Sequence, residues 1–371
     1  MISMLSTLTE GKKTLLIILF AFALYFPLTF LGYGTDCDSE SVIKTAQNID
    51  QQDRYIPSRL PGYFVHEFST AILFKLGGSF LSNVGTMIMS LLTIYFFIQI
   101  CQYHYIPHKY LLALFLILNP VYWVNSTCTI DYSWALALLL AGYMFLKEKS
   151  YITAGILLGL SIGTRLSSII FVAALFISYV LTKEPDRKKV FLSLAISIAV
   201  GALLYLPPFI YMGGSFKFLT YDMGEMDWFG HLARFVYKNI YIIGLQTFIA
   251  SLLMSPFIIK GFRQNYKDYE NILLFSFLII AGFETMYMKF PLEMSYLLPM
   301  LPFLLMLLGI SLKNNKGIII FLLIVQFSYN LVNINIARPD VSNIATSATL
   351  GLWIEWGYLI TDIINRLAML S

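Results

Sequence analysis

Acidic residues at alternate positions follow the first apolar segment of the chain. Asp36, Asp38 and Glu40 lie in the run Gly34-Thr35-Asp36-Cys37-Asp38-Ser39-Glu40. In an irregular or extended segment, this alternation puts Asp36 and Asp38 on one side of the backbone. There they could share Mg²⁺ or Mn²⁺, or one of them could act as a general base that requires no cofactor. A solvated acidic loop without chemistry explains the same run equally well.

An arginine between prolines and a glycine comes next. Arg59 lies in the run Tyr55-Ile56-Pro57-Ser58-Arg59-Leu60-Pro61-Gly62-Tyr63. The prolines and the glycine restrict the backbone, so the guanidinium is presented in a defined direction. A planar cation of this kind suits a phosphate group. The alternative is a rigid turn in which Arg59 pairs with Asp50 or Asp53.

Two further charged residues lie beside apolar segments. Asp131 opens one of these segments, where capping of a helix N-terminus alone would explain it. Arg165 lies between two others, and a cation in that position needs an anion or a polar cavity. Arg165 is therefore either a ligand-binding residue or the structural partner of Asp131.

A lysine and a carboxylate gather near the start of a later apolar segment. Lys289, Glu293 and Tyr296 lie in the run from Lys289 to Pro299. They are either simple anchors at the membrane interface or members of one cavity shared with the earlier acids and cations. The residues expected to support the site or to contact an acceptor are Tyr55, Tyr63, His66, Glu67, Asp131, Glu293 and Tyr296.

The elements that must position these residues are membrane helices. Apolar residues make up 58% of the 371 residues and charged residues only 12%, whereas soluble domains have about 45–50% and about 25%. The apolar residues come in blocks of roughly 17–25, the length of a helix that crosses a bilayer. The net charge of +4 is small and spread along the chain, which argues against nucleic acid as a partner.

These blocks predict an all-α fold, a polytopic transmembrane bundle of about 11 helices with amphipathic interfacial helices in its extracytoplasmic loops. Some blocks are short, so we expect those helices to be tilted or buried inside the protein. The predicted spans are 15–34, 83–102, 109–124, 133–146, 152–164, 168–181, 190–206, 240–259, 272–287, 295–311 and 317–335.

The distribution of Lys and Arg predicts the orientation of the bundle. One set of segments holds 14 Lys and Arg against 6 Asp and Glu, and the rest of the chain holds 11 against 15. Positively charged loops stay in the cytoplasm, so the candidate site faces outward from the membrane. Short loops favour a bacterial plasma (inner) membrane. The positive set is the N-terminus with 104–109, 147–150, 182–189, 260–271 and 313–316.

Two predicted external segments are long, 35–82 and 207–239. The first ends in an apolar stretch, 64–76, that is expected to lie in the interface as an amphipathic helix. The second has a mixed polar and aromatic surface that suits a segment lying on the membrane.

The chain is predicted to have one large module and a short tail. Residues 1–335 form the transmembrane module, and residues 336–371 form a C-terminal amphipathic segment on the extracytoplasmic side. Glu355, Asp362 and Arg366 interrupt the apolar residues of this tail, which favours a surface helix over a twelfth span.

Four motifs, in their order along the chain, resemble the GT-C superfamily of membrane glycosyltransferases. This superfamily includes protein O-mannosyltransferases and lipid A aminoarabinose transferases. The resemblance covers residues 14 to about 335, and the sequence has Asp-Cys-Asp where the mannosyltransferases have adjacent Asp-Glu. The motifs are Asp-x-Asp at 36–38, Ser-Arg-x-Pro-Gly-Tyr at 58–63, Gly-x-x-x-Gly-x-Arg-x-Ser at 159–167 and Glu-x-x-Tyr-Leu-Leu-Pro at 293–299.

The resemblance implies a polyprenyl-phosphate or dolichyl-phosphate sugar as donor and inversion at the anomeric carbon. It also implies a first-loop acid near the acceptor, which here is Asp36 with Asp38 as its partner. Such a transfer needs a base for the acceptor hydroxyl and cations for the departing phosphate. Arg59, Arg165 and Lys289 are the expected phosphate ligands, and the acceptor is a glycolipid, a cell-wall polymer or a protein.

Two other classes of function use the same features. A transporter or flippase for a lipid-linked sugar or another anion would use a similar cationic cavity, but it predicts charges at mid-bilayer or on both sides. A membrane scaffold without activity accounts for the helices but leaves Arg165 unexplained. Labelling of cysteines substituted for Arg59, Arg165 and Glu293 from the cytoplasmic side would favour transport.

Overall fold

The computed structural model describes residues 9–182, 186–215, 228–339 and 348–370. Residues 216–227 of the predicted external segment 207–239 lie outside the described residues, as do residues 340–347 of the predicted C-terminal segment. The fold is helical, as predicted, with one small hairpin of strands. Its helices are α2 (Glu10–Tyr25), η1 (Phe26–Phe30), α3 (Cys37–Gln52), α4 (Phe64–Tyr103), α5 (Lys109–Ile117), α6 (Pro120–Asn125), α7 (Tyr132–Lys147), α8 (Tyr151–Thr164), η2 (Leu166–Ser168), α9 (Ile169–Thr182), α10 (Arg187–Leu204), α11 (Leu206–Tyr211), α12 (Trp228–Tyr241), α13 (Leu245–Leu253), α14 (Ser255–Asn265), η4 (Tyr266–Tyr269), α15 (Glu270–Lys289), η5 (Met294–Met300), α16 (Leu301–Ser311), α17 (Lys316–Leu331) and α18 (Tyr358–Leu370), and its strands are β1 (Val332–Pro339) and β2 (Ala348–Trp356).

Membrane-spanning helices make up most of the fold. Within the described residues, five helical stretches are long and apolar enough to cross a membrane, and α12 with α13 would be a sixth with a bend of 78°. The helices α7, α8, α9 and α17 are shorter and also apolar. The chain is therefore a multi-pass membrane protein. The five stretches are Glu10–Phe30, Phe64–Tyr103, Arg187–Tyr211, Ser255–Lys289 and Met294–Ser311.

Two of the predicted spans are divided in the structure. The span predicted at 109–124 breaks before Pro120, because the side chain of Asn119 accepts a hydrogen bond from the Tyr122 amide and starts α6 as a separate helix. The span predicted at 240–259 is divided among α12, α13 and α14. Gly244, with φ of +83°, stands before α13 and ends the helical path of α12.

The helix that ends at Arg165 is held by close backbone packing. Gly155 and Gly159 of α8 face α10, and a Cβ on Gly159 would lie 2.5 Å from the Cβ of Val200. Small residues four apart let two membrane helices approach this closely. The tight pairing of α8 with α10 fixes the end of α8, and with it the start of the Arg165 side chain.

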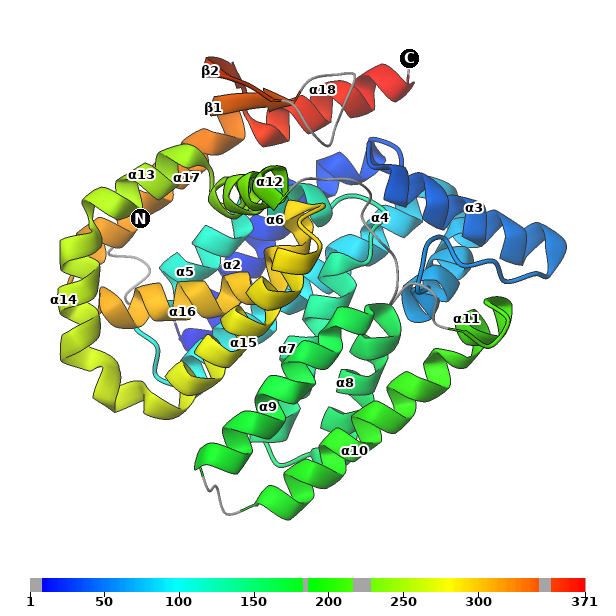
Figure 1. The fold of residues 1–371 in the computed structure, drawn as a ribbon, viewed down its shortest axis with the longest axis horizontal. Coiled ribbons are helices and arrows are strands. Elements are labelled where there is room, and N and C mark those ends of the chain that lie inside the picture. Colours follow the sequence, from blue (N-terminus) through cyan, green and yellow to red (C-terminus); the bar gives the residue numbers. More distant parts are fainter. Residues whose placement is uncertain (1–8, 183–185, 216–227, 340–347, 371) are drawn as a thin grey trace.

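The predicted internal and external segments lie at opposite ends of the bundle. In Figure 1, the upper part carries α3, α12, α18 and the strands, and the lower end carries the C-terminal end of α9 and the N-terminal end of α10. α14 runs down the left edge and α15 returns toward the centre, so the turn between them is also low in this view. Ion pairs join Lys109 to Glu10 and Lys313 to Asp268 among the predicted internal segments.

The first external segment is more helical than expected. Asp36 and Asp38 were expected in an irregular or extended stretch, but α3 begins at Cys37 directly after Asp36. The apolar stretch 64–76 is helical, as predicted, and forms the first part of α4. A kink at Gly77 and Gly78 separates it from the remainder of α4, because Gly78 adopts a φ of +58°.

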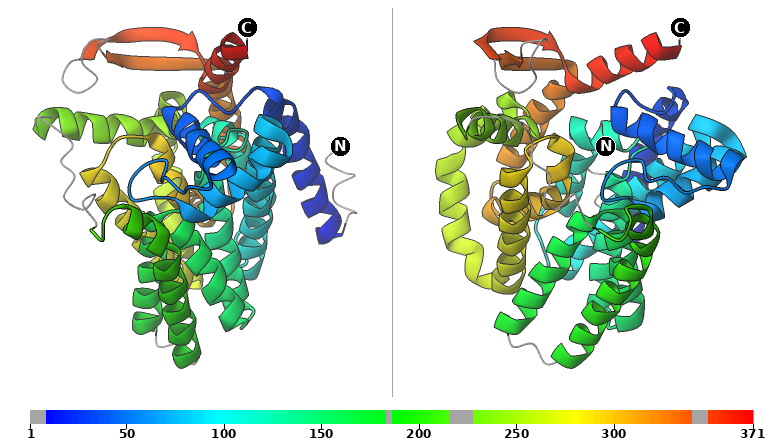
Figure 2. Two further views of the ribbon diagram at one scale, coloured as in Figure 1. Left: turned by 90° about the vertical axis from the view of Figure 1, so that its right-hand side faces the viewer. Right: turned by 45° about the vertical axis from the view of Figure 1, so that its right-hand side comes forward.

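The C-terminal segment contains a hairpin that the sequence analysis did not predict. The last predicted span, 317–335, ends as a helix at Leu331, and β1 pairs antiparallel with β2 from Val332 opposite Trp356. Alternation of apolar and polar residues in Val332-Asn333-Ile334-Asn335 is typical of a strand and would have indicated it. Both views in Figure 2 show the hairpin and α18 lying across one end of the bundle.

The predicted C-terminal helix is present as α18, but its charged residues do not face solvent. Asp362 is 6% exposed and Arg366 is 1% exposed. Arg366 donates hydrogen bonds to the carbonyls of Leu28 and Leu31, at the end of the first membrane helix, and to Thr127. These charges therefore hold α18 against the protein, whereas the sequence analysis took them as the polar side of a surface helix.

Candidate active site

A buried carboxylate organises the cations at the upper end of the bundle. Asp131 is 0% exposed. It accepts a hydrogen bond from Nη2 of Arg59 at 2.7 Å and another from Nη1 of Arg165 at 2.6 Å. Burial opposes ionisation of Asp131, but the two guanidiniums outweigh burial and lower the pKa of its carboxyl. The expectation that Asp131 only caps a helix is wrong, because its side chain caps nothing at the start of α7.

Aromatic rings surround the second of these cations. Arg165 follows α8 in an extended conformation, φ −148° and ψ 123°, which turns its side chain away from the helix. Its guanidinium carbon lies 3.9 Å from the ring centroid of Tyr132 and 5.2 Å from that of Tyr296. Ring faces attract a cation, and this attraction strengthens when water is excluded. The predicted pairing of Arg165 with Asp131 is confirmed; whether Arg165 also binds a ligand stays a prediction.

The loop that presents Arg59 is fastened by Glu67. The carboxylate of Glu67 accepts hydrogen bonds from the hydroxyl of Tyr55 at 2.6 Å, from the amide and hydroxyl of Ser58 at 2.7 and 2.5 Å, and from the amide of Tyr63 at 3.2 Å. Four donors from one short loop converge on a single side chain of α4. Tyr55, Tyr63 and Glu67 were expected to support the site. In the structure, their hydrogen bonds hold the backbone around Arg59 in place.

Gly62 lets the same loop lie against α11. Its φ is +99°, and an added Cβ would lie 2.8 Å from the ring of Pro208. A side chain at this position would push the loop away from the bundle.

Arg59 links Asp131 to the acids of the first loop. Its Nε lies 3.0 Å from Oδ2 of Asp38, and its guanidinium carbon lies 4.2 Å from the ring centroid of Tyr63. The alternative that Arg59 pairs with Asp50 or Asp53 is wrong, because Asp50 pairs with Lys75 and Asp53 is the C-cap of α3. Nη1 of Arg59 is buried without a hydrogen-bond partner among the described residues, so it can donate to a ligand.

Asp36 and Asp38 have different surroundings although they are two residues apart. Asp36 is the N-cap of α3, and its Oδ1 accepts a hydrogen bond from the amide of Asp38 at 2.9 Å. It is partly exposed and lines a cavity. Burial raises the pKa of Asp38, and Arg59 holds its carboxylate in an ion pair. Of the two acids, Asp36 is therefore the one that faces the cavity.

A third acid, Glu293, interacts electrostatically with Asp36 and Asp38. Glu293 precedes η5, and its Oε2 accepts a hydrogen bond from the hydroxyl of Tyr132 at 2.6 Å. Burial and the nearby charges of Asp38 and Asp36 raise the pKa of Glu293 to about 7. A carboxyl with a pKa near 7 can exchange a proton at physiological pH.

This raised pKa predicts how pH affects the stability of the folded protein. In the unfolded chain this carboxyl has a pKa near 4.5. Between about pH 4.5 and pH 7, the folded state therefore keeps the proton that the unfolded state has lost, and the stability of the folded state falls as pH rises through that window. Glu293→Gln keeps an acceptor for Tyr132 and removes the titration. We expect the variant to raise the melting temperature at pH 8 and to leave it nearly unchanged at pH 4.5, as measured by thermal unfolding in detergent. An equal change at both pH values would contradict the assignment.

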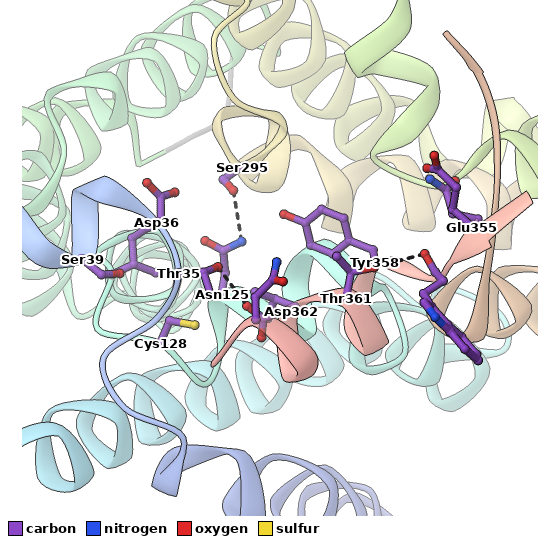
Figure 3. Close-up of a pocket in the computed structure, with 15 residues that line it drawn as sticks. Thr35, Asp36, Ser39, Asn125, Cys128, Ser295, Glu355, Tyr358, Thr361 and Asp362 are labelled. Atoms are coloured by element: carbon purple, nitrogen blue, oxygen red, sulfur yellow. Dashed lines mark hydrogen bonds between the residues drawn. The ribbon is translucent and has the colours of Figure 1, made fainter. Parts of the chain in front are cut away.

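A cavity of about 540 Å³ lies beside Asp36. It is lined by residues from 35–39 and 124–130, by Ser295 of η5, and by residues of β1, β2 and α18. Figure 3 shows Asp36 and Thr35 on one side and Tyr358, Thr361 and Asp362 of α18 on the other. A hydrogen bond of 3.0 Å joins Asn125 to Ser295 in its wall. The cavity has the volume of a small-molecule site, and it brings a carboxylate, hydroxyls and amides to one space.

The predicted metal ligands lie close together, but their surroundings suit a cation poorly. Ligand atoms of Asp36, Cys37 and Asp38 all lie within 4.8 Å of one another. The Asp38 carboxylate is already paired with Arg59, and the amide groups at the start of α3 repel a cation. Hard cations such as Mg²⁺ prefer several oxygen ligands, whereas this group offers one uncommitted carboxylate.

Two of the predicted site residues lie apart from these contacts. Lys289 is exposed at the end of α15, its Nζ is 5.2 Å from the ring centroid of Phe290, and it forms no ion pair among the residues that the structure describes. His66 is 0% exposed, lies 5.5 Å from Trp134 between ring centroids, and contacts Thr70. It is not among the residues that line the cavity, but it interacts electrostatically with Asp131, Arg59 and Arg165.

Several residues of the site were not found from the sequence. Lys238 of α12 interacts electrostatically with Glu293 and Asp36, although it lies in a segment interpreted as a membrane-surface loop. Tyr358 and Asp362 line the cavity from α18. The position of Lys238 on the polar side of an amphipathic helix was the one sequence pattern that could have indicated its role. No sequence pattern indicated that α18 lies beside the first external segment.

The comparisons with known proteins bear on the fold. No protein-family model and no curated protein sequence matches the chain significantly. The crystal structure of ArnT from Cupriavidus metallidurans in the apo state is similar, with 15% sequence identity and a TM-score of 0.56. The match covers 81% of this chain and 59% of that chain. The two chains therefore share a fold, and the predicted polytopic helical bundle is confirmed.

Proposed function

We propose that this chain, which has a fold similar to that of ArnT, is an inverting glycosyltransferase. It moves a sugar from a polyprenyl-phosphate donor to an acceptor hydroxyl at the extracytoplasmic surface of a bacterial plasma membrane. The observation that carries the proposal is the meeting of Asp36 with the Asp38–Arg59–Asp131–Arg165 network at one end of a membrane bundle. A base and cations are what this reaction requires.

Asp36 acts as the general base in this proposal. The acceptor hydroxyl gives its proton to the Asp36 carboxylate, and its oxygen forms a bond to the anomeric carbon of the sugar. The bond between that carbon and the phosphate oxygen breaks, and the lipid phosphate leaves with the electron pair. Attack and departure on opposite faces invert the anomeric centre. Asp38 holds Arg59 in position and does not take the proton.

The departing phosphate needs more positive charge than the buried arginines supply. Arg59 and Arg165 are balanced by Asp38 and Asp131, although Nη1 of Arg59 stays available. Lys238 adds a cation near Asp36 and Glu293, and we assign it to the phosphate beside Arg59 and Arg165. Lys289 stays a proposed ligand that would reach the phosphate from the end of α15.

The proposal includes transfer without a bound metal ion. The commitment of Asp38 to Arg59 leaves too few oxygen ligands for Mg²⁺ or Mn²⁺. We expect treatment of the purified protein with 1,2-diaminocyclohexane tetraacetate or EDTA to leave the transfer rate within about two-fold of the untreated rate. The measurement is release of labelled sugar from the donor. Loss of activity that Mn²⁺ restores would assign the metal to Asp36 and Asp38 instead.

The experiment that tests the function is a donor panel. Purified protein in lipid nanodiscs is incubated with radiolabelled polyprenyl-phosphate sugars that differ in the sugar, with membrane extract as acceptor source. We expect one donor to lose its sugar at a rate well above that of the Asp36→Asn variant. Failure of every donor with every extract would remove the enzyme proposal.

Transport is the competing function, and the charge pattern favours it less. The described ion network lies beside external segments, whereas a transporter needs a site accessible from both sides. A topology reporter fused after residue 40 is expected to lie outside the cytoplasm. A cytoplasmic reporter, or labelling of cysteines at positions 59 and 165 from the cytoplasmic side, would support transport.

A further inference from the structure

The C-terminal elements form one wall of the cavity that holds Asp36. Asn333 lies at the start of β1, Glu355 and Trp356 at the end of β2, and Tyr358 on α18. Figure 3 shows Tyr358 on the side of the cavity opposite Asp36, with Glu355 farther away beyond Tyr358. Without the hairpin and α18, the carboxylate of Asp36 would face open solvent on this side.

A buried arginine holds this wall in place. Arg366 donates to the carbonyls of Leu28, Leu31 and Thr127 at 2.9, 3.1 and 2.8 Å, and its Nη1 lies 3.4 Å from Oδ2 of Asp362. Thr35, the residue before Asp36, donates to Oδ1 of Asp362 at 3.3 Å. The position of α18 is therefore tied directly to the segment that carries the proposed base.

The cavity presents hydrogen-bonding groups that have no partner among the described residues. The buried atoms Ser39 Oγ and Asn333 Oδ1 have no partner among the described residues, and both residues line the cavity. Ser39 is 0% exposed. The hydroxyl of Tyr358 points into the cavity toward Ser295 and Asn125. Buried polar groups without a partner cost free energy, so their presence at one cavity indicates a ligand that supplies the missing hydrogen bonds.

We infer that this cavity is the acceptor subsite and that the acceptor is a saccharide. This inference rests on the proposed function. Hydroxyls, amides and carboxylates beside a tyrosine and a tryptophan match a polyhydroxylated ring, which has hydrogen-bonding edges and an apolar face. A lipid chain would leave the polar groups unsatisfied. A peptide acceptor also has backbone amides, but it lacks a ring that combines hydroxyls along its edge with an apolar face.

The test separates acceptor binding from donor chemistry. Methyl glycosides of hexoses serve as acceptor probes, an acetylated serine peptide serves as the alternative, and release of labelled sugar to water reports on donor cleavage alone. Tyr358→Phe removes one hydroxyl and Asn333→Leu removes one side-chain amide, and both substitutions approximately keep the side-chain size. Tyr105→Phe is the matched control, because Tyr105 is 85% exposed and is not among the residues that line the cavity.

We expect a methyl glycoside to accept the sugar and the peptide to accept none. Each of the two cavity variants should raise the KM for the glycoside about three-fold to ten-fold, the effect of one neutral hydrogen bond. Release to water by the unsubstituted protein reports donor cleavage, and the melting temperature of each variant checks that it is folded. Transfer to the peptide, or a KM for the glycoside equal to that of Tyr105→Phe, would overturn the inference.

A binding measurement decides the inference even if no donor is cleaved. Trp356 lines the cavity, so methyl glycosides should quench a fluorescence component that Trp356→Phe lacks. Quenching without donor cleavage would support a saccharide subsite and remove the glycosyltransferase proposal. Donor cleavage without quenching or glycoside transfer would support the enzyme and overturn the saccharide acceptor.

Discussion

Replacement of Asp36 by Asn abolishes measurable sugar transfer and leaves donor binding largely intact. A general base contributes about 10²–10⁴-fold to a rate, and Asn cannot accept the proton of the acceptor hydroxyl. The amide oxygen of Asn can still accept the hydrogen bond that the Asp38 amide gives at 2.9 Å, so α3 should begin as before. Single-turnover release of labelled sugar measures the rate, and equilibrium binding of the labelled donor measures its affinity.

Two matched variants make this result specific. Glu40→Gln removes an exposed acid of the same segment, whose nearest cation is Lys44 at 3.6 Å, and should transfer sugar at the normal rate. Asp38→Asn weakens the hold on Arg59 and should raise the donor KM more than it lowers kcat. Near-normal transfer by Asp36→Asn would exclude Asp36 as the base, and a matching loss in Glu293→Gln would move that role to Glu293.

Asp131→Asn should produce the largest loss of stability in the chain. The substitution leaves the buried guanidiniums of Arg59 and Arg165 without their shared carboxylate. Breaking a buried pair from one side costs about 3–5 kcal/mol, because the remaining charge is uncompensated. Thermal unfolding of the purified protein in one detergent measures the change. We expect a large fall in melting temperature or a strong fall in folded yield.

An exposed pair provides the control for this prediction. Asp50 lies 3.0 Å from Lys75, whose side chain is 70% exposed, so Asp50→Asn should change stability by at most about 1 kcal/mol. Adding Arg165→Met to Asp131→Asn removes one of the stranded cations and should recover part of the loss. If Asp131→Asn unfolds like Asp50→Asn, the ion network does not hold this end of the bundle together.

The membrane helices were the most predictable part of the fold. Blocks of apolar residues are a local property of the chain, and lipid requires that such blocks satisfy their own backbone hydrogen bonds as helices. The breaks at Asn119 and Gly244 depend on single residues inside apolar blocks, and a hydropathy pattern does not show them. The hairpin of β1 and β2 was missed because residues 332–335 were read as the end of a span, although they alternate in the manner of a strand.

The sequence identified most of the charged residues of the site but few of the ion pairs that they form. Asp36, Asp38, Arg59, Arg165 and Glu293 attracted attention because charge next to apolar sequence is costly, and the structure brings all five to one end of the bundle. The pairing of Arg165 with Asp131 was one of the alternatives drawn from the sequence. The pairing of Arg59 with Asp38 and Asp131 was not predicted, because Asp50 and Asp53 lie nearer to Arg59 along the chain. Lys289 looked equivalent to these residues in the sequence, yet the end of α15 leaves it exposed.

By itself, the sequence determined that this protein is a helical membrane protein, which side its charged loops favour, and which ionisable residues need an explanation. Each of these follows from local composition and from the cost of apolar groups in water or of charges in lipid. Only the tertiary structure showed that Asp131 forms ion pairs with both Arg59 and Arg165. Only the tertiary structure showed that hydrogen bonds of Arg366 hold α18 beside the cavity that Asp36 lines. Those contacts join residues between 34 and 338 positions apart, and distance along the chain carries no information about which partner a buried charge will meet.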